Sequence, residues 1–199
     1  EEPMNKNFYI FRHGESTFNL AGRVQGCTDM SVLTAKGRRQ AAGTAEILKN
    51  RNIEIIISSP LKRAVETGNI VAEKIHVPLN IDRRFTEVNI GIIEGLLYDE
   101  VLEKYGELYN RWRNADCEDE TFCFPGGESK QTVRKRIFEA LNHYAEQTDY
   151  RNIAVSGHGI ILKQSLKALG TEIDDIPNGS VIHLQYNNAH WQTDGIIYH

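Results

Sequence analysis

The chain has 199 residues, of which 40% are apolar and 25% charged, and its formal net charge at neutral pH is −4. This composition is typical of a folded domain, and the net negative charge argues against a general nucleic-acid binder. No run approaches the roughly 18 apolar residues that span a bilayer, so we expect no membrane partner. We expect a single domain over residues 1–199.

The predicted elements begin with three segments that share one pattern. Short β-branched or aromatic runs at 8–11, 53–57 and 153–155 each lead into a turn of small residues. Helical periodicity follows the second and third runs, over 61–75, with Ser59 as the expected N-cap, and over 160–169. Further helices are expected at 35–50, 98–113 and 130–146, and short strands near 78–81, 180–185 and 195–198.

The order of these elements predicts the fold class. Strands that alternate with helices form βαβ units, in which helices cover both faces of a parallel sheet. We therefore expect an α/β fold, a three-layer αβα sandwich with a largely parallel central sheet.

The segment at about 90–128 breaks the alternation. It combines an aromatic stripe (Tyr105, Tyr109 and Trp112) with an acidic run at 116–120 and the turn Pro125-Gly126-Gly127. We interpret it as a helical insertion over the C-terminal ends of the strands that forms part of the site wall. The stripe is interpreted as helix packing rather than a substrate platform, and the acidic run as a solvated loop.

The three cysteines bear on compartment and metal binding. Cys27, Cys117 and Cys123 are odd in number and match no CxxC spacing. They are therefore expected to be free thiols of a reducing compartment, with neither a disulfide nor a metal site. This favours a cytoplasmic location.

Unusual polar residues follow each of the three strands. Arg12 and His13 end the first, Arg63 opens the helix after the second, and His158 follows the third. Ligands of parallel α/β sheets bind beyond the carboxyl ends of the strands, so these side chains are candidates for one crevice. Guanidinium groups and helix N-termini both suit phosphate.

This set of residues indicates phosphoryl transfer without a metal. Arginines can neutralise the phosphoryl charge, which leaves a histidine nitrogen free to attack, provided that the other ring nitrogen donates to a backbone carbonyl. We expect no metal and no other cofactor. An acid must protonate the leaving oxygen. The candidates are Glu87, Glu15, Glu94 and Asp29, and spacing does not choose among them.

Beyond the spacing, the sequence resembles a known family. Arg12-His13-Gly14-Glu15-Ser16 with Asn19 resembles the R-H-G-x-[ST]-x-x-N signature of the histidine phosphatase superfamily, which includes phosphoglycerate mutases. The likeness extends through the stretches at 22–41, 58–67, 87–95, 125–129 and 156–159. It covers nearly the whole chain in the family's order.

The resemblance implies roles for particular residues. His13 would be the nucleophile that becomes phosphohistidine, and Glu87 would be the acid. The phosphoryl group would be bound by the side chains of Arg12, Asn19, Arg63 and His158 and by the backbone at Gly159. Gln25 and Gly26 align with a stretch that contacts substrate.

The resemblance also favours the phosphatase branch. The acid segment reads Glu87-Val88-Asn89-Ile90-Gly91, whereas the compared mutases carry E-R-H-Y-G. One departure is Gly157, which stands before His158 and is expected to adjust the turn. We expect a phosphatase that acts on a small phosphomonoester, as a monomer or homodimer. The alternatives are a phosphoglycerate mutase and a non-catalytic phosphate-binding module.

Overall fold

The computed structural model describes residues 5–197 and contains a six-stranded sheet in the order β3-β2-β4-β1-β5-β6. Strands β1 to β4 are parallel, and β5 runs antiparallel to β1 and to β6. The largely parallel sheet is therefore confirmed. The strands are β1 (Lys6–Arg12), β2 (Ile55–Ser58), β3 (Leu79–Ile81), β4 (Asn152–Gly157), β5 (Val181–Asn187) and β6 (His190–Ile197).

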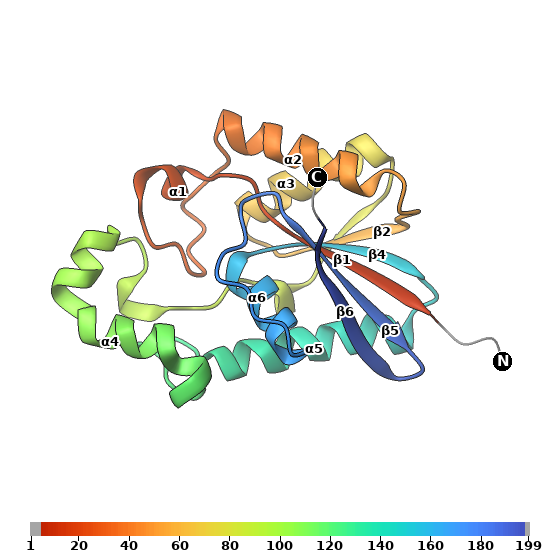
Figure 1. Ribbon diagram of the computed structural model, residues 1–199. Helices are drawn as coiled ribbons and strands as arrows, with labels where there is room; N and C mark the ends of the chain where they lie inside the picture. Colours follow the sequence, from red (N-terminus) through yellow and green to blue (C-terminus); the bar gives the residue numbers. More distant parts are fainter. Residues whose placement is uncertain (1–4, 198–199) are drawn as a thin grey trace.

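Helices cover both faces of this sheet, as Figure 1 shows. The helices are α1 (Thr17–Ala21), α2 (Ala35–Leu48), α3 (Lys62–Ile75), α4 (Tyr98–Glu118), α5 (Lys130–Gln147) and α6 (Gly159–Ala168), with the short 3-10 turns η1 (Arg83–Phe85) and η2 (Gly91–Ile93). Helices α2 and α3 pack on one face, whereas α5 and α6 pack on the other. The three-layer αβα architecture is thus confirmed. None of the helices within residues 5–197 is long and apolar enough to cross a membrane.

The first strand shows why both faces must be covered. Side chains alternate along a strand, and Phe8 and Ile10 are buried in the core beside α5 and α6. Tyr9 and Phe11 are buried in the second core, beside α2 and α3. A strand that is apolar on both sides is stable only between two layers of helices.

Three local expectations were wrong. Ser59 is not the N-cap of α3, because Leu61 holds that position and the Ser59 hydroxyl faces His158. The acidic run at 116–120 is not a solvated loop, since α4 continues to Glu118. The last strand begins at His190 rather than near 195, and Tyr198 lies outside the described residues.

The insertion helix α4 lies at the end of the sheet where the parallel strands terminate (Figure 1). It contains one non-helical residue, Tyr105, at which its axis kinks. Trp112 is 6% exposed and packs in the main core, which agrees with its interpretation as a packing residue.

A backbone contact joins the turn after β1 to helix α2. A Cβ built on Gly14 would lie 2.1 Å from the Gly37 carbonyl oxygen, and one built on Gly37 would lie 2.1 Å from the Glu15 oxygen. Such distances are far below any van der Waals contact, so only glycine fits at either position. The turn that carries His13 therefore rests directly on α2.

This contact predicts opposite effects for one substitution at two helical glycines. Gly37→Ala should lower the free energy of unfolding by about 1–3 kcal/mol, because the added methyl overlaps backbone that cannot easily move. Gly106→Ala in α4 meets no atom within 4 Å, and it should raise stability by about 0.5–1 kcal/mol through helix propensity. Urea unfolding measures both values. Equal changes would show that the Gly14–Gly37 approach is not constraining.

Candidate active site

A cavity of about 540 Å³ opens beyond the carboxyl ends of the parallel strands. Arg12, the last residue of β1, and His13 line it, as does Arg63 from the first turn of α3. Gly159 at the start of α6 joins them from the end of β4. The structure thus brings together residues from three junctions that are far apart in the sequence.

His13 is buried, with 2% of its surface exposed. Its Nδ1 lies 2.7 Å from the Gly14 carbonyl oxygen. Because a carbonyl only accepts, Nδ1 carries the hydrogen and Nε2 keeps a free lone pair. Burial, reinforced by the charges of Arg63 and Arg12, holds the pKa of His13 well below its ordinary value of 6.5. The ring is therefore neutral, as a nitrogen nucleophile must be.

His158 lies against His13, and the centroids of the two rings are 5.3 Å apart. Its Nε2 is 2.7 Å from the Ser59 hydroxyl, which explains why that serine faces the site. Its Nδ1 is buried and has no partner within residues 5–197. Burial, together with Arg63, keeps the pKa of His158 well below 6.5. A second neutral imidazole is thus held beside the first with one nitrogen unused.

Arg63 is buried and Arg12 is partly buried, and neither has a carboxylate partner within residues 5–197. Arg12 donates from Nη1 to the Ile176 carbonyl at 2.6 Å, and Arg63 donates from its two terminal nitrogens to the carbonyls of Thr28 and Gly26, each at 2.7 Å. The Nε groups of both arginines are buried, and neither has a partner within residues 5–197. Guanidinium groups held by neutral carbonyls keep their positive charge available to an anion.

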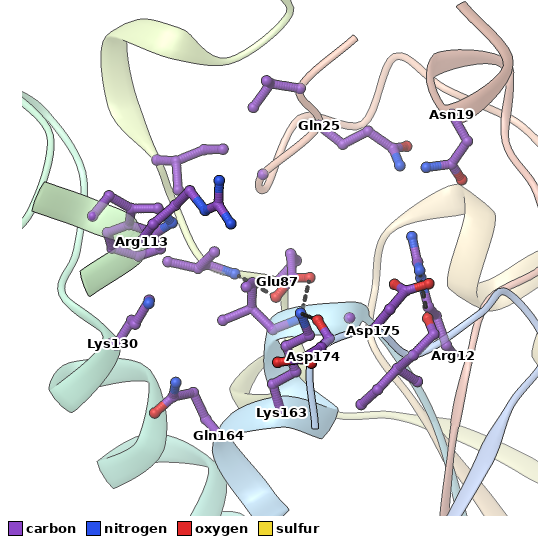
Figure 2. Close-up of a pocket in the computed structure, with 18 of the residues that line it drawn as sticks. Arg12, Asn19, Gln25, Glu87, Arg113, Lys130, Lys163, Gln164, Asp174 and Asp175 are labelled. Atoms are coloured by element: carbon purple, nitrogen blue, oxygen red, sulfur yellow. Dashed lines mark hydrogen bonds between the residues drawn. The ribbon is translucent and has the colours of Figure 1, made fainter. Parts of the chain in front are cut away.

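Glu87 lines the same cavity, is 8% exposed and interacts electrostatically with Arg63 and Arg12. Its Oε1 accepts from the Val88 amide at 3.0 Å, and its Oε2 accepts from the Ile160 amide at 3.0 Å, as the dashed line in Figure 2 shows. Burial raises its pKa, although the two amides and the arginines oppose the rise. A buried carboxyl group of this kind keeps its proton to a higher pH than an exposed one does.

The other three acid candidates are engaged outside the cavity lining. Glu15 forms an ion pair with Lys36 at 3.1 Å. Glu94 accepts from the Cys27 amide at 2.9 Å, and Asp29 accepts from the Lys62 amide at 2.6 Å. Glu87 is thus the only one of the four that lines the cavity, whereas the others organise the surrounding loops.

The segment that carries Glu87 is held by an arginine that the sequence analysis missed. Arg136 of α5 donates to the carbonyls of Arg84 and Thr86 at 2.7 and 2.6 Å. It also forms an ion pair with Glu128 at 2.6 Å. Glu128 in turn accepts from the Asn89 amide at 3.0 Å. This clamp fixes the backbone on both sides of Glu87.

Asn19 and Gln25 present amides at the mouth of the cavity (Figure 2). The Gln25 Oε1 accepts from the hydroxyls of Ser16 and Ser31, both at 2.7 Å. The Asn19 Oδ1 accepts from the Ser16 amide at 3.1 Å. Because both oxygens are occupied, the two NH₂ groups are left to donate into the cavity. Gly26 lines it beside them.

Sequence reasoning also missed the short helix α1 and the asparagine that steadies it. Ser16 and Asn19 form a capping box at the start of α1, a pattern that the spacing S-T-F-N could have revealed. Asn178 donates to the His13 carbonyl at 3.0 Å and to Asn19 Oδ1 at 3.3 Å. No sequence pattern signals Asn178, because its partners lie some 160 residues away.

Two expectations about the surroundings can be compared with the structure. Gly157 belongs to β4 and has no positive φ, so the turn at His158 requires no special backbone from it, and that expectation was wrong. Cys27 and Cys123 are free thiols, as expected, and the side chain of Cys117 is not among those described. Within residues 5–197, no three histidine, cysteine or acidic side chains are grouped as metal ligands.

Comparison with known proteins gives the same family over nearly the whole chain. The sequence model of the histidine phosphatase superfamily (branch 1) matches residues 8–197. Phosphoserine phosphatase 1 of Hydrogenobacter thermophilus is 32% identical over 184 residues, which is 88% of this chain and 85% of the relative. A protein named "Probable phosphoglycerate mutase" in Salmonella choleraesuis is 31% identical over 195 residues, 95% of this chain and 89% of the relative.

Solved structures agree with the sequence comparison. A mycobacterial glucosyl-3-phosphoglycerate phosphatase, determined as a complex with VO3, superposes with a TM-score of 0.84 at 25% identity. The match covers 97% of this chain and 98% of that one.

The buried imidazoles predict a stability loss in acid. The folded protein keeps His13 and His158 neutral, whereas the unfolded chain protonates them below about pH 6.5. Lowering the pH through 6.5 should therefore reduce the free energy of unfolding, by up to about 1.4 kcal/mol per pH unit for each ring. Glu87, with its raised pKa, acts in the opposite direction at lower pH.

Urea unfolding at pH 7.5 and at pH 6.0 measures this loss. His13→Gln should weaken the pH dependence, because it removes one of the two rings that must become charged. His143→Gln, at an exposed position of α5, controls for the removal of a histidine from the chain. If the free energy of unfolding of His13→Gln depends on pH as steeply as that of the wild type, then His13 is not held neutral in the folded protein.

Proposed function

Because this chain belongs to the histidine phosphatase superfamily, we propose that it is a metal-independent phosphomonoesterase acting on small phosphorylated metabolites. The observation that carries the proposal is the pairing of a neutral His13, with Nε2 free, and two guanidinium groups, those of Arg12 and Arg63, that form no ion pair with a carboxylate within residues 5–197. His13 would be the nucleophile, and the two guanidinium groups would bind the phosphoryl group that it attacks.

In the proposed reaction, His13 Nε2 attacks phosphorus and the bond from phosphorus to the ester oxygen breaks. Glu87 gives its proton to the departing oxygen, which leaves as the alcohol. Water then attacks the phosphohistidine and returns a proton to Glu87, which releases phosphate and restores both groups. The carboxyl group acts first as acid and then as base, so its raised pKa serves both steps.

The remaining site residues would bind the phosphoryl oxygens. Arg12 and Arg63 supply the positive charge that other phosphoryl-transfer enzymes take from a metal. The free Nδ1 of His158, the amide of Asn19 and the backbone N–H of Gly159 at the start of α6 would add neutral donors. Gln25 and Gly26 would contact the alcohol part of the substrate, at the cavity mouth.

The names of the relatives support a phosphatase, and one of them suggests a second candidate function. Phosphatase names occur among the sequence relatives and the solved structures, and one of those structures holds VO3. The relative named for phosphoglycerate mutase makes isomerisation the second candidate. To separate the two candidates, the protein is incubated with phosphomonoesters and, separately, with 3-phosphoglycerate plus 2,3-bisphosphoglycerate. Release of free phosphate identifies a phosphatase, whereas formation of the isomeric phosphoglycerate identifies a mutase. A non-catalytic phosphate-binding module would give neither product.

The covalent step predicts that His13→Ala abolishes turnover, because the other neutral imidazole, His158, would donate from its Nδ1 and so would have no lone pair there to attack phosphorus. The wild type, quenched during turnover of a ³²P-labelled ester under conditions that spare acid-labile bonds, should carry label on histidine. The variant should carry none. Turnover that persists in the variant would contradict the covalent mechanism.

The proton transfer predicts a dependence on the leaving group. Glu87→Gln should slow hydrolysis of alkyl phosphates by about 10²–10⁴-fold. It should slow p-nitrophenyl phosphate far less, since nitrophenolate leaves without a proton. Glu15→Gln, outside the cavity lining, serves as the matched control and should not separate the two substrates. Equal slowing of both esters by Glu87→Gln would assign the acid to another group.

A further inference from the structure

Glu87 reaches the cavity from a stretch of chain that is neither helix nor strand. Residues 86–90 lie between the 3-10 turns η1 and η2, so no regular element fixes their backbone. The Glu87 carboxyl group nevertheless meets the Ile160 amide at the start of α6, and its Oε2 accepts from that amide at 3.0 Å. The backbone of this stretch is therefore held from outside.

Arg136 of α5 binds the backbone on the N-terminal side of the acid. Its Nη1 donates to two carbonyls, that of Arg84 at 2.7 Å and that of Thr86 at 2.6 Å. Its Nη2 donates to the carbonyl of Glu87 itself at 3.4 Å. One guanidinium group thus contacts three carbonyls of the segment 84–89.

Glu128 holds the other edge of the same guanidinium group. Its Oε2 lies 3.2 Å from Arg136 Nε and its Oε1 lies 2.6 Å from Arg136 Nη2, a two-point ion pair that fixes the plane of the guanidinium. Glu128 also binds the backbone beyond the acid, since Oε1 accepts from the Asn89 amide at 3.0 Å and the Glu128 amide donates to the Asn89 carbonyl at 2.8 Å. Two side chains that bind each other therefore hold the chain on both sides of Glu87.

Neither Arg136 nor Glu128 lines the cavity, so neither would touch a bound substrate. Arg136 can act on the reaction through the segment 84–89 or through its charge. Burial is the main cause of the low pKa of His158, and the charge of Arg136 adds to it. A variant that keeps the charge is therefore needed to separate the two routes.

We propose that Arg136 is a positioning residue for the general acid, because its hold on the segment 84–89 keeps the Glu87 carboxyl group at the Ile160 amide and within reach of the leaving oxygen. The role of Glu87 as the acid rests on the proposed function, whereas the positioning of its carboxyl group does not. Proton transfer needs heavy atoms about 2.6–3.2 Å apart. A displacement of about 1 Å can cost about 10²-fold in rate.

The position of the carboxyl group can be measured without a substrate. Glutamate is labelled with ¹³C at the side-chain carboxyl carbon, and the NMR signal of Glu87 is identified by its absence from Glu87→Gln. Burial raises the pKa of Glu87 in the wild type. In Arg136→Gln the pKa of Glu87 should fall toward its ordinary value of 4.5, because a carboxyl group that is no longer held reaches water.

Three further variants show whether the fall comes from geometry. Arg136→Lys keeps the charge, but a single ammonium nitrogen cannot span the carbonyls and Glu128, so the pKa should fall as in Arg136→Gln. Glu128→Gln removes the ion pair and should cause a smaller fall in the same direction. It also provides a test if the Arg136 variants do not fold. Arg134→Gln is the matched control and should cause no fall, because the Arg134 side chain is similarly exposed, at 20% against 19%, and pairs with Glu120 instead.

Rates connect the position of the carboxyl group to catalysis. The ratio of kcat/KM for p-nitrophenyl phosphate to kcat/KM for an alkyl phosphate should rise about tenfold or more in Arg136→Lys, since only the alkyl ester needs the proton. Arg134→Gln should leave this ratio unchanged. In the double variant of Glu87→Gln and Arg136→Lys the ratio should be no higher than in Glu87→Gln alone, because no acid remains to be misplaced.

The possible results separate the two proposals. A Glu87 pKa that stays raised in folded Arg136→Lys or Glu128→Gln would overturn the positioning role, as would an equal fall in Arg134→Gln. A higher ratio in the double variant than in Glu87→Gln would also overturn it, because Arg136 would then act by a route other than Glu87. If the wild type hydrolyses no ester while the pKa of Glu87 falls in Arg136→Lys but not in Arg134→Gln, the proposed function fails and the positioning of Glu87 stands.

Discussion

The rest of the site depends on two guanidinium groups, one buried and one partly buried, that have no carboxylate partner within residues 5–197. Arg12 and Arg63 are held by backbone carbonyls, which orient them but leave their charge uncompensated. Removing a cation from water is costly unless something anionic meets it, so this part of the cavity favours an anionic ligand. Burial, reinforced by these charges, keeps the pKa values of His13 and His158 low and their rings unprotonated. In the proposed reaction the two arginines would therefore bind the phosphoryl group and also help to keep the attacking nitrogen neutral.

The pKa of Glu87 is set by opposing effects. Burial favours its protonated form, while the same two arginines and two backbone amides favour the carboxylate. The balance remains on the side of a raised pKa. Arg136 and Glu128 hold the backbone of this segment, so the carboxyl group keeps its place as its charge changes. Its environment suits a group that must both give and take a proton.

Much of this could be predicted from the sequence, because it follows from local pattern and one topological rule. The alternation of Phe8, Tyr9 and Ile10 requires two layers of helices, and parallel strands bring Arg12 and His158 to one edge. What could not be predicted depends on distant partners. The link from Asn178 to His13 joins residues 165 positions apart, and the pairing of Asp116 with Lys130 and Gln164 turns an acidic run into part of a wall. Ser59 was misassigned because its hydroxyl serves His158 rather than the helix that it precedes.

The segment between α6 and β5 holds the phosphoryl end together although it carries no residue of the family's motifs. The Ile176 carbonyl anchors Arg12, and the Asn178 amide anchors both His13 and Asn19. A fragment truncated after Gly159 would thus still contain every motif residue, yet Arg12 and His13 would each have lost an anchor. A complete set of motif residues is therefore not enough to assemble this site, because the segment between α6 and β5 also holds it in place.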